Sequence, residues 1–225
     1  MITTQEEFYK YEWLRDILEE GGETDSRPEE STKFVPSSIE RLYGTLKLLE
    51  GLRHGDVVMD LGSGKGVLMQ ALKRFAPDVT YVGVDHEQSN VDYLNSLDDP
   101  KVIGVCANLL DGIPRVPEIH KIDYITCIGV FGIGDVWCRS TAYGLLDIMW
   151  EKSYKGIIAS FLREDKDDTF NDNTFDPLKV YVRLLRFSKR ATIFQPHVPH
   201  FVVGAAYKFD TIWMDEWRAA GGRKK

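Results

Sequence analysis

Cysteine is scarce in this chain of 225 residues, and the three present are Cys106, Cys127 and Cys138. Their positions lack the spacing of a metal-ligand set, so no metal site is expected. Cys106 and Cys127 fall inside predicted strands, which favours buried thiols. Cys138 follows the fourth predicted strand without a nearby base, so a structural role is favoured over a catalytic one.

Positive charge is also in short supply, because 28 Lys and Arg residues face 35 Asp and Glu residues, for a net charge of −7. A protein that clamps a phosphate backbone usually presents a basic face, and the only clear basic cluster outside the predicted helices is Arg223-Lys224-Lys225. No segment reads as a membrane span, and the first seven residues are polar and acidic where a signal peptide would be basic and then apolar. We therefore expect a cytoplasmic protein, monomeric or homodimeric, with neither nucleic acid nor membrane as a partner.

The most informative segment is residues 58–66, which read as a buried strand that runs directly into a glycine-rich turn. Gly62, Gly64 and Gly66 lack a Cβ atom, so the backbone there can bend sharply or approach a ligand closely. Apolar residues at helical spacing follow from Val67 to Phe75. The turn therefore delivers a ligand to a helix N-terminus, which carries free N–H groups.

The residues around these glycines exclude two common ligands. A Walker phosphate loop requires Ser or Thr after its Gly-Lys pair, but Gly64-Lys65 is followed by Gly66. The dinucleotide fingerprint requires a third glycine where this chain has Val67. Asp60, two residues ahead of the first glycine, suits a ligand that bears an ammonium and a sulfonium better than a pyrophosphate. A dinucleotide oxidoreductase is therefore a distant alternative.

The pattern Asp-x-Gly-x-Gly-x-Gly resembles the first motif of the class I S-adenosylmethionine-dependent methyltransferases. Asp85 ends a second predicted strand 23 residues after Gly62, where an acid can chelate two ribose hydroxyls. Asn108 follows a third predicted strand, at a place where the family commonly holds the adenine amine. A fourth predicted strand covers residues 123–128, and its end lies over the methionine portion of the cofactor in the family. The resemblance runs from about Phe34 to Tyr207.

The resemblance implies S-adenosylmethionine as cofactor and S-adenosylhomocysteine as product. The residues that it assigns to cofactor binding are Asp60, Gly62, Ser63, Gly64, Gly66, Asp85, His86, Asn108, Leu109 and Ile128.

The fold class that follows is α/β: a doubly wound, Rossmann-like sheet of seven strands, mostly parallel with one antiparallel strand, plus an N-terminal helical extension. Residues 1–33 are expected to form a helix and a flexible acidic linker that could act as a lid, residues 34–208 the methyltransferase domain, and residues 209–225 a C-terminal segment. Within the domain we expect a helix over 143–150 and a strand over 156–161. Asp176 is expected to cap the next helix.

Three of the assigned residues have a structural alternative. Asp60 could cap the helix after the glycine turn, and Asp85 could cap the helix that begins near Gln88. Asn108 could serve a turn through hydrogen bonds to its own backbone.

Candidates for catalysis follow from the chemistry, an in-line displacement at the methyl carbon that depends mainly on alignment. Asp135 and Trp137 follow the fourth predicted strand, at the sheet edge where open α/β proteins bind ligands. His197 is the candidate base, in the predicted hairpin loop that it shares with His200. Asp135 could equally cap a helix that begins near Val136.

The acceptor is expected to be a small molecule, methylated on an O or N atom. Enzymes that methylate amino groups of nucleic-acid bases carry Asn or Asp followed by Pro-Pro and an aromatic residue after the fourth strand, but this chain has residues 127–130, Cys-Ile-Gly-Val. A protein-lysine methyltransferase is the first alternative, because residues 32–37 resemble the entry segment of some such enzymes. A catalytically silent domain that binds the cofactor or its product is the second, since a pocket does not demonstrate turnover.

Overall fold

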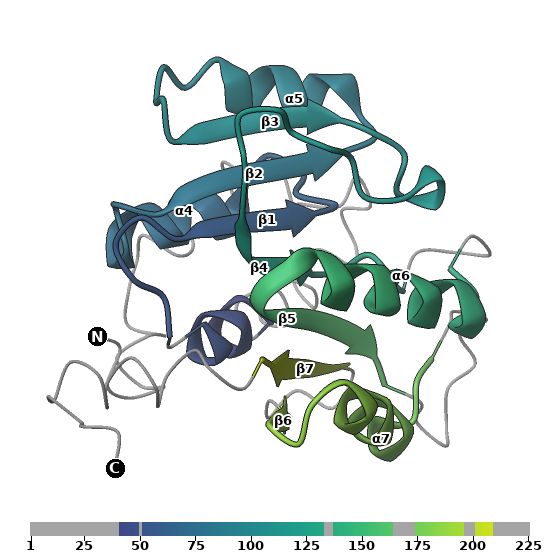
Figure 1. Ribbon diagram of the computed structural model, residues 1–225. Helices are drawn as coiled ribbons and strands as arrows, with labels where there is room; N and C mark the ends of the chain where they lie inside the picture. The colour runs from purple at the N-terminus through teal and green to yellow at the C-terminus, as the bar shows by residue number, and fades with distance from the viewer. Residues whose placement is uncertain (1–40, 50, 133–136, 164–173, 196–200, 209–225) are drawn as a thin grey trace, which may run out of the picture.

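The computed structural model describes residues 41–49, 51–132, 137–163, 174–195 and 201–208 (Figure 1). Its strands are β1 (Val57–Leu61), β2 (Thr80–Asp85), β3 (Val102–Cys106), β4 (Ile122–Cys127), β5 (Ser153–Leu162), β6 (Ala191–Phe194) and β7 (Phe201–Tyr207). Its helices are α4 (Val67–Phe75), α5 (Gln88–Asn95), the short 3-10 helix η1 (Leu109–Asp111), α6 (Arg139–Lys152) and α7 (Pro177–Phe187), and residues 41–48 form a further helical segment.

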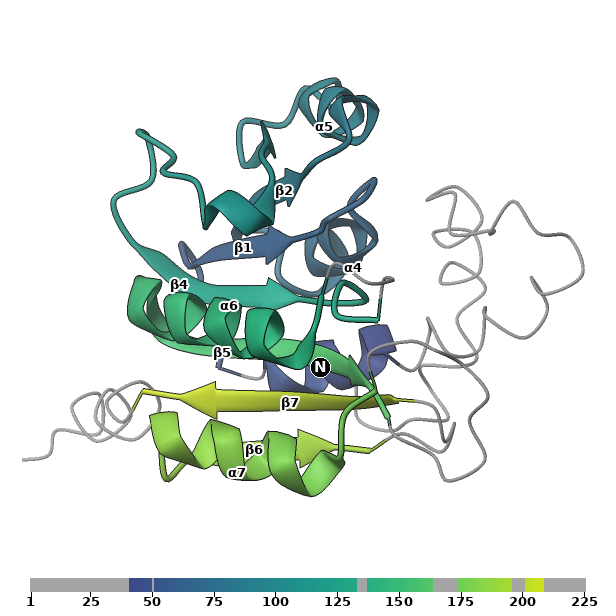
Figure 2. The same ribbon diagram turned by 90° about the vertical axis from the view of Figure 1, so that its right-hand side faces the viewer.

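The strands form one sheet in the order β3-β2-β1-β4-β5-β7-β6. The first five strands of this order run parallel to one another, whereas β7 is antiparallel to both β5 and β6. Figure 2 shows this reversal, because the arrowhead of β7 points away from those of β1, β4 and β5. The predicted α/β class, with seven strands of which one is antiparallel, is confirmed.

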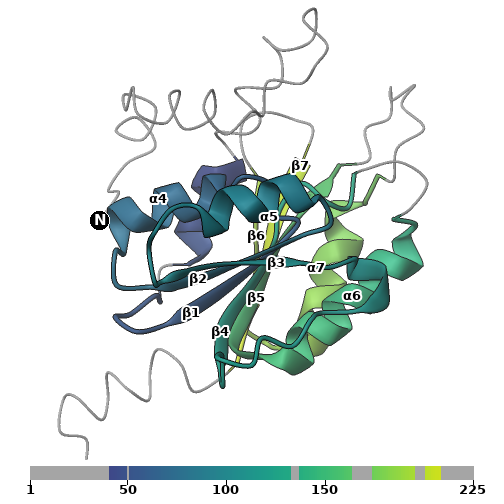
Figure 3. The ribbon, with the colours of Figure 1, turned by 90° about the horizontal axis from the view of Figure 1, so that it is seen from above.

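Helices cover both faces of the sheet (Figure 3). Met59 and Leu61 of β1 pack with side chains of α6 and α7, whereas Val58 packs with side chains of α4 and the segment 41–48. This division follows from the alternation of side chains along a strand. The next residue on the Val58 face is Asp60, so a carboxylate is carried into an otherwise apolar layer.

Several predicted boundaries shift. Helix α6 begins at Arg139 with Cys138 at its N-cap, whereas Asp135 and Val136 lie outside the described residues, so the alternative that Asp135 caps a helix near Val136 stays untested. Strand β5 begins at Ser153 rather than at residue 156. Asp176 does cap α7, since its Oδ1 accepts hydrogen bonds from the first backbone N–H groups of that helix. The predicted N-terminal helix, acidic linker and C-terminal segment lie outside the described residues, so the domain bounds stay a prediction.

A buried ion pair joins the amino ends of two strands. The Lys155 ammonium on β5 lies 2.8 Å and 2.9 Å from the two carboxylate oxygens of Asp56, the residue before β1. Both side chains are almost completely buried. Asp123 of β4 lies between these strands and accepts a hydrogen bond from the Val57 backbone N–H at 3.0 Å. The amino ends of β1, β4 and β5 are therefore tied together by polar contacts.

Within the described residues, no helix is long and apolar enough to cross a bilayer. In the same part of the chain, no group of three or more His, Cys, Asp or Glu residues is placed to hold a metal ion.

Candidate functional site

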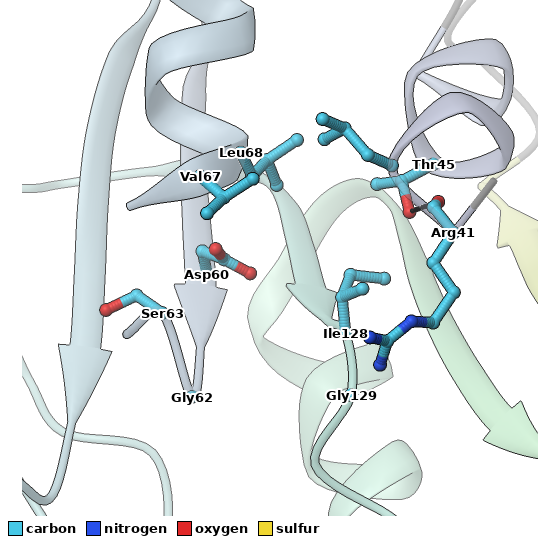
Figure 4. Close-up of a pocket in the computed structure, with 10 residues that line it drawn as sticks. Arg41, Thr45, Asp60, Gly62, Ser63, Val67, Leu68, Ile128 and Gly129 are labelled. Atoms are coloured by element: carbon cyan, nitrogen blue, oxygen red, sulfur yellow. Dashed lines mark hydrogen bonds between the residues drawn. The ribbon is translucent and has the colours of Figure 1, made fainter. Parts of the chain in front are cut away.

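A cavity of about 240 Å³ lies at the carboxyl ends of β1 and β4, beneath the helical segment 41–48 (Figure 4). The residues that line it are Arg41, Leu42, Thr45, Asp60, Gly62, Ser63, Val67, Leu68, Ile128 and Gly129. Of the residues predicted to bind the cofactor, the structure brings Asp60, Gly62, Ser63 and Ile128 together here.

The turn between β1 and α4 requires glycine at three positions. Gly62, Gly64 and Gly66 have φ values of +72°, +51° and +79°, in the left-handed region that side chains disfavour. A Cβ atom on Gly62 would lie 2.3 Å from a methyl carbon of Val130, and one on Gly66 would lie 2.7 Å from Leu94. Gly64 differs, since nothing lies within 4 Å of its Cβ position, so its backbone is open to a ligand.

Asp60 is held by hydroxyl groups from the two neighbouring strands. Its Oδ2 accepts a hydrogen bond from the Tyr81 hydroxyl at 2.7 Å, and its Oδ1 accepts one from the Thr126 hydroxyl at 2.7 Å. Gly83 leaves room for the Tyr81 ring, because a Cβ there would lie 3.0 Å from that ring. Burial and the Asp60 carboxylate raise the pKa of Tyr81, which keeps it a donor. The N-cap of α4 is Gly66, with no side-chain hydrogen bond, so the alternative that Asp60 caps this helix is wrong.

Asp85 ends β2, and its carboxylate holds two turns in place. Its Oδ2 accepts the backbone N–H of Gly64 at 2.7 Å, and its Oδ1 accepts that of Glu87 at 2.9 Å and the Asn90 amide at 3.3 Å. Helix α5 has Glu87 as N-cap with no side-chain cap, so Asp85 does not cap the helix at Gln88. Asp85 is buried and does not line the cavity that contains Asp60.

The other residues predicted for the adenosine end also lie outside this cavity. The His86 side chain is 73% exposed, and its ring nitrogens lie 3.5 Å from the Asp85 carboxylate and 3.3 Å from that of Glu87. Asn108 is exposed and caps η1, where its Oδ1 accepts the Leu110 backbone N–H at 3.0 Å. Leu109 is the first residue of that short helix. The turn role considered for Asn108 is therefore present.

Sequence reasoning missed the cationic side of the cavity. Arg41 enters it from the helical segment 41–48, opposite the side from which Asp60 enters (Figure 4). Its guanidinium lies 5.7 Å from the centre of the Phe201 ring, and its Nη1 lies 2.7 Å from the Cβ position of Gly129. Gly129, with φ of +80°, thus leaves the space that the guanidinium occupies. A glycine after the fourth strand was the only sequence signal, and it does not point to Arg41.

Of the predicted catalytic residues, the structure describes Trp137, which does not line this cavity. Trp137 is 7% exposed and packs edge-on against Phe131, with ring centroids 5.7 Å apart, so it belongs to the core under α6. Asp135 and His197 lie outside the described residues. Their roles stay predictions.

Of the three thiols only Cys127 is buried, so the expectation of a buried thiol is wrong for Cys106, and Cys138 is exposed as well. Hydrogen bonds from the hydroxyls of Ser140 and Thr141, each 3.0 Å from its sulfur, lower its pKa to about 7. Burial raises the pKa of Cys127 instead. An exposed thiol with a lowered pKa is reactive towards alkylating agents, but it lies apart from the cavity.

The strand order, the reversed seventh strand and the glycine turn after β1 define the fold of the class I S-adenosylmethionine-dependent methyltransferases. Neither a protein-family model nor a curated protein matches the chain.

Several solved structures share the fold at low sequence identity. Magnesium protoporphyrin IX methyltransferase (ChlM) from Synechocystis PCC 6803, with bound SAH, is 12% identical over 89% of this chain and 97% of its own, with a TM-score of 0.64. The plantazolicin methyltransferase BpumL, in complex with SAH, is 12% identical over 91% and 99%, with a TM-score of 0.55. The methyltransferase domain of bacterial CtHen1 is 16% identical over 76% and 99%, with a TM-score of 0.56. At such identities the likeness shows the fold.

Proposed function

We propose that this protein is an S-adenosylmethionine-dependent methyltransferase that transfers a methyl group to an O or N atom of a small-molecule acceptor. The observation that carries the proposal is the cavity at the end of β1, where the Asp60 carboxylate lies beside a turn of three left-handed glycines. The named neighbours ChlM and BpumL are described with bound SAH, which supports the same cofactor here.

The cavity suits the amino-acid end of the cofactor because it offers both charges. Asp60 presents a carboxylate from β1, and Arg41 presents a guanidinium from the opposite side (Figure 4). An amino-acid group carries an ammonium and a carboxylate, so each would find an oppositely charged partner. We assign the ammonium to Asp60 and the carboxylate to Arg41.

The adenosine end would extend past the glycine turn towards Asp85. In the structure, the Gly64 backbone N–H donates a hydrogen bond to Asp85 Oδ2 at 2.7 Å. A carboxylate has about four acceptor positions, and Asp85 uses three, so a ribose hydroxyl can add to this set or replace the Gly64 contact. Asn108 and Leu109 follow the next strand and are assigned to the adenine, with His86 at the exposed rim.

When bound, the cofactor supplies an activated methyl group on a sulfonium. The chain must then hold the acceptor about 3 Å from that carbon, in line with the departing sulfur. A hydroxyl or ammonium acceptor also has to lose a proton, for which His197 stays the proposed base, and Asp135 stays the residue proposed to hold the acceptor. Trp137 supports the same edge of the sheet from the core.

A small acceptor is favoured over a macromolecule by two facts. ChlM and BpumL are named for magnesium protoporphyrin IX and plantazolicin. The net charge of −7 is unfavourable for a nucleic-acid substrate. Cytoplasmic location and a monomeric or homodimeric state stay predictions.

The proposal is tested by calorimetric titration of the purified chain with S-adenosylmethionine, S-adenosylhomocysteine and NAD, followed by transfer assays with labelled methyl groups. We expect micromolar binding of the first two ligands, no binding of NAD, and label in small-molecule acceptors. Binding of NAD alone would overturn the cofactor assignment. Binding without transfer to any small acceptor would leave the silent binding domain as the better description, and label in lysine peptides alone would favour the protein-lysine alternative.

A further inference from the structure

A second cavity, of about 460 Å³, lies where β4 and β5 begin. Its walls are the loop between η1 and β4, the junction of α6 and β5, and Lys208 just after β7. These elements meet at the edge of the sheet opposite the arrowheads of β4 and β5 (Figure 2). The cavity is therefore separate from the one that contains Asp60.

The distance between the two sites follows from strand geometry. Ile122, at the start of β4, lines the second cavity, and Ile128, just after the end of β4, lines the first. Six residue steps at about 3.3 Å each place these residues about 20 Å apart. A ligand in the second cavity is thus beyond contact with the group transferred in the first.

The walls of this cavity are basic, although the chain as a whole is acidic at −7. Four cationic side chains line it, with one carboxylate among them, so the lining residues carry a net charge of +3 when histidine is neutral. The cations are Arg115, Lys121, Lys152 and Lys208, the carboxylate is Glu151, and the histidine is His120.

Two of these cations are already engaged. The Lys121 ammonium lies 2.8 Å from the Asp123 carboxylate, and that hydrogen bond raises the pKa of Lys121. Lys208 donates to the Ser153 carbonyl oxygen and lies 4.9 Å from the centre of the Trp150 ring. Burial lowers the pKa of Lys208, so a nearby anion would stabilise its charged form.

The other two cations have no such partner. Among the described residues, the side chains of Arg115 and Lys152 form no hydrogen bond or ion pair, and both residues are exposed at the cavity wall. Beside them, the Tyr154 side chain is 58% exposed, with the Lys121 ammonium 4.7 Å from its ring centre. The cavity thus combines two available cations with an exposed aromatic face.

We propose that this cavity binds a phosphate-bearing small molecule, up to the size of a nucleotide, at a site independent of the cofactor. A guanidinium donates in a planar fork that matches two phosphate oxygens, and an ammonium adds a point charge, so Arg115 and Lys152 suit a phosphate better than an isolated carboxylate. The volume lies in the range of small-molecule pockets. Tyr154 offers a surface on which a base can stack.

The test is calorimetric titration of the full chain with inorganic pyrophosphate and with ADP. We expect both to bind the wild-type protein, and Lys152→Gln and Arg115→Gln each to weaken pyrophosphate binding about tenfold, the loss expected for one charge-assisted hydrogen bond. Lys179→Gln is the matched control, because it removes one exposed cation at the start of α7 and should bind as the wild type does. Tyr154→Ala should weaken ADP but not pyrophosphate, which separates a nucleotide ligand from a simple phosphate.

Three outcomes would overturn the proposal. One is the absence of pyrophosphate binding at millimolar concentration, and another is unchanged binding in both the Lys152 and Arg115 variants. The third is an equal loss in Lys179→Gln, which would indicate general attraction to positive charge. The pyrophosphate readouts are independent of methyl transfer and of the cofactor site, because pyrophosphate has neither the adenosine nor the amino-acid group assigned to that site.

Discussion

Substitution of Asp60 by Asn separates the role of its charge from its role in the fold. The carboxylate accepts hydrogen bonds from Tyr81 and Thr126 on the adjacent strands, so Asp60→Ala would leave two buried hydroxyls without these acceptors. Asn has nearly the same shape, keeps one carbonyl oxygen as an acceptor, and places an NH₂ group where a hydroxyl oxygen can accept, since hydroxyls rotate. We therefore expect Asp60→Asn to fold with a stability loss of about 1 kcal/mol.

The effect on cofactor binding should be larger than the effect on the fold. An ammonium that loses a charged acceptor forfeits about 1.5–3 kcal/mol. Because about 1.4 kcal/mol corresponds to a tenfold change in affinity, the dissociation constant of S-adenosylhomocysteine should rise roughly ten- to 150-fold. Thermal unfolding without ligand should change little, whereas the stabilisation that the ligand gives should shrink in step with affinity.

Calorimetric titration and thermal unfolding of the same samples provide the assay. Asp92→Asn is the control, because it removes an exposed carboxylate on α5 and changes net charge by the same amount. Its affinity for S-adenosylhomocysteine should equal that of the wild type. If Asp60→Asn also binds with wild-type affinity while its unfolding temperature is unchanged, Asp60 is not the ammonium partner and the reasoning about the cavity fails.

Three further predictions concern stability and reactivity. Gly62→Ala should lower the free energy of unfolding by about 1–3 kcal/mol, and the unfolding temperature should fall by about 2–4 °C for each kcal/mol lost. Gly144→Ala is the control, because its Cβ would lie in open space on α6, and it should leave stability unchanged or raise it. Asp56→Asn should cost about 3–5 kcal/mol in urea unfolding, because it leaves the buried Lys155 ammonium without its carboxylate, and Asp56→Asn with Lys155→Met should recover part of this loss. Alkylation of Cys138 by iodoacetamide, followed by peptide mass spectrometry, should accelerate as pH rises through about 7, since the thiolate is the nucleophile; an unchanged rate between pH 6 and 8 would contradict this.

The glycine turn and the end of β2 could be predicted from the sequence, because the local residue pattern there agrees with the topology of the sheet. The strand that contains Asp60 and the glycines after it predicted the turn, because left-handed backbone, and at Gly62 close packing against Val130, leave little alternative to glycine. Asp85 was placed correctly at the end of β2, since an acid after an apolar strand marks the carboxyl edge of the sheet. Its hydrogen bond to Gly64 was not foreseen, because that contact depends on the distance between two strands.

The residues that sequence reasoning missed are those that only the tertiary structure brings together. Arg41 looks like any charged residue on a helix, and its place in the cavity depends on the space left by Gly129. Arg115 and Lys152 are far apart in the chain and line the same cavity because β4 and β5 begin side by side. Trp137 was assigned to the site from its position after β4, whereas the packing of α6 places it in the core.

Because the two cavities lie at opposite ends of the strands, a charged support that binds one end would orient the molecule. A sulfonated resin would attract the basic edge where β4 and β5 begin, even though the chain carries a net charge of −7. The cavity that contains Asp60 would then face the liquid. Adsorption through this edge is thus a way to attach the protein uniformly while leaving that cavity open to small ligands in the flow.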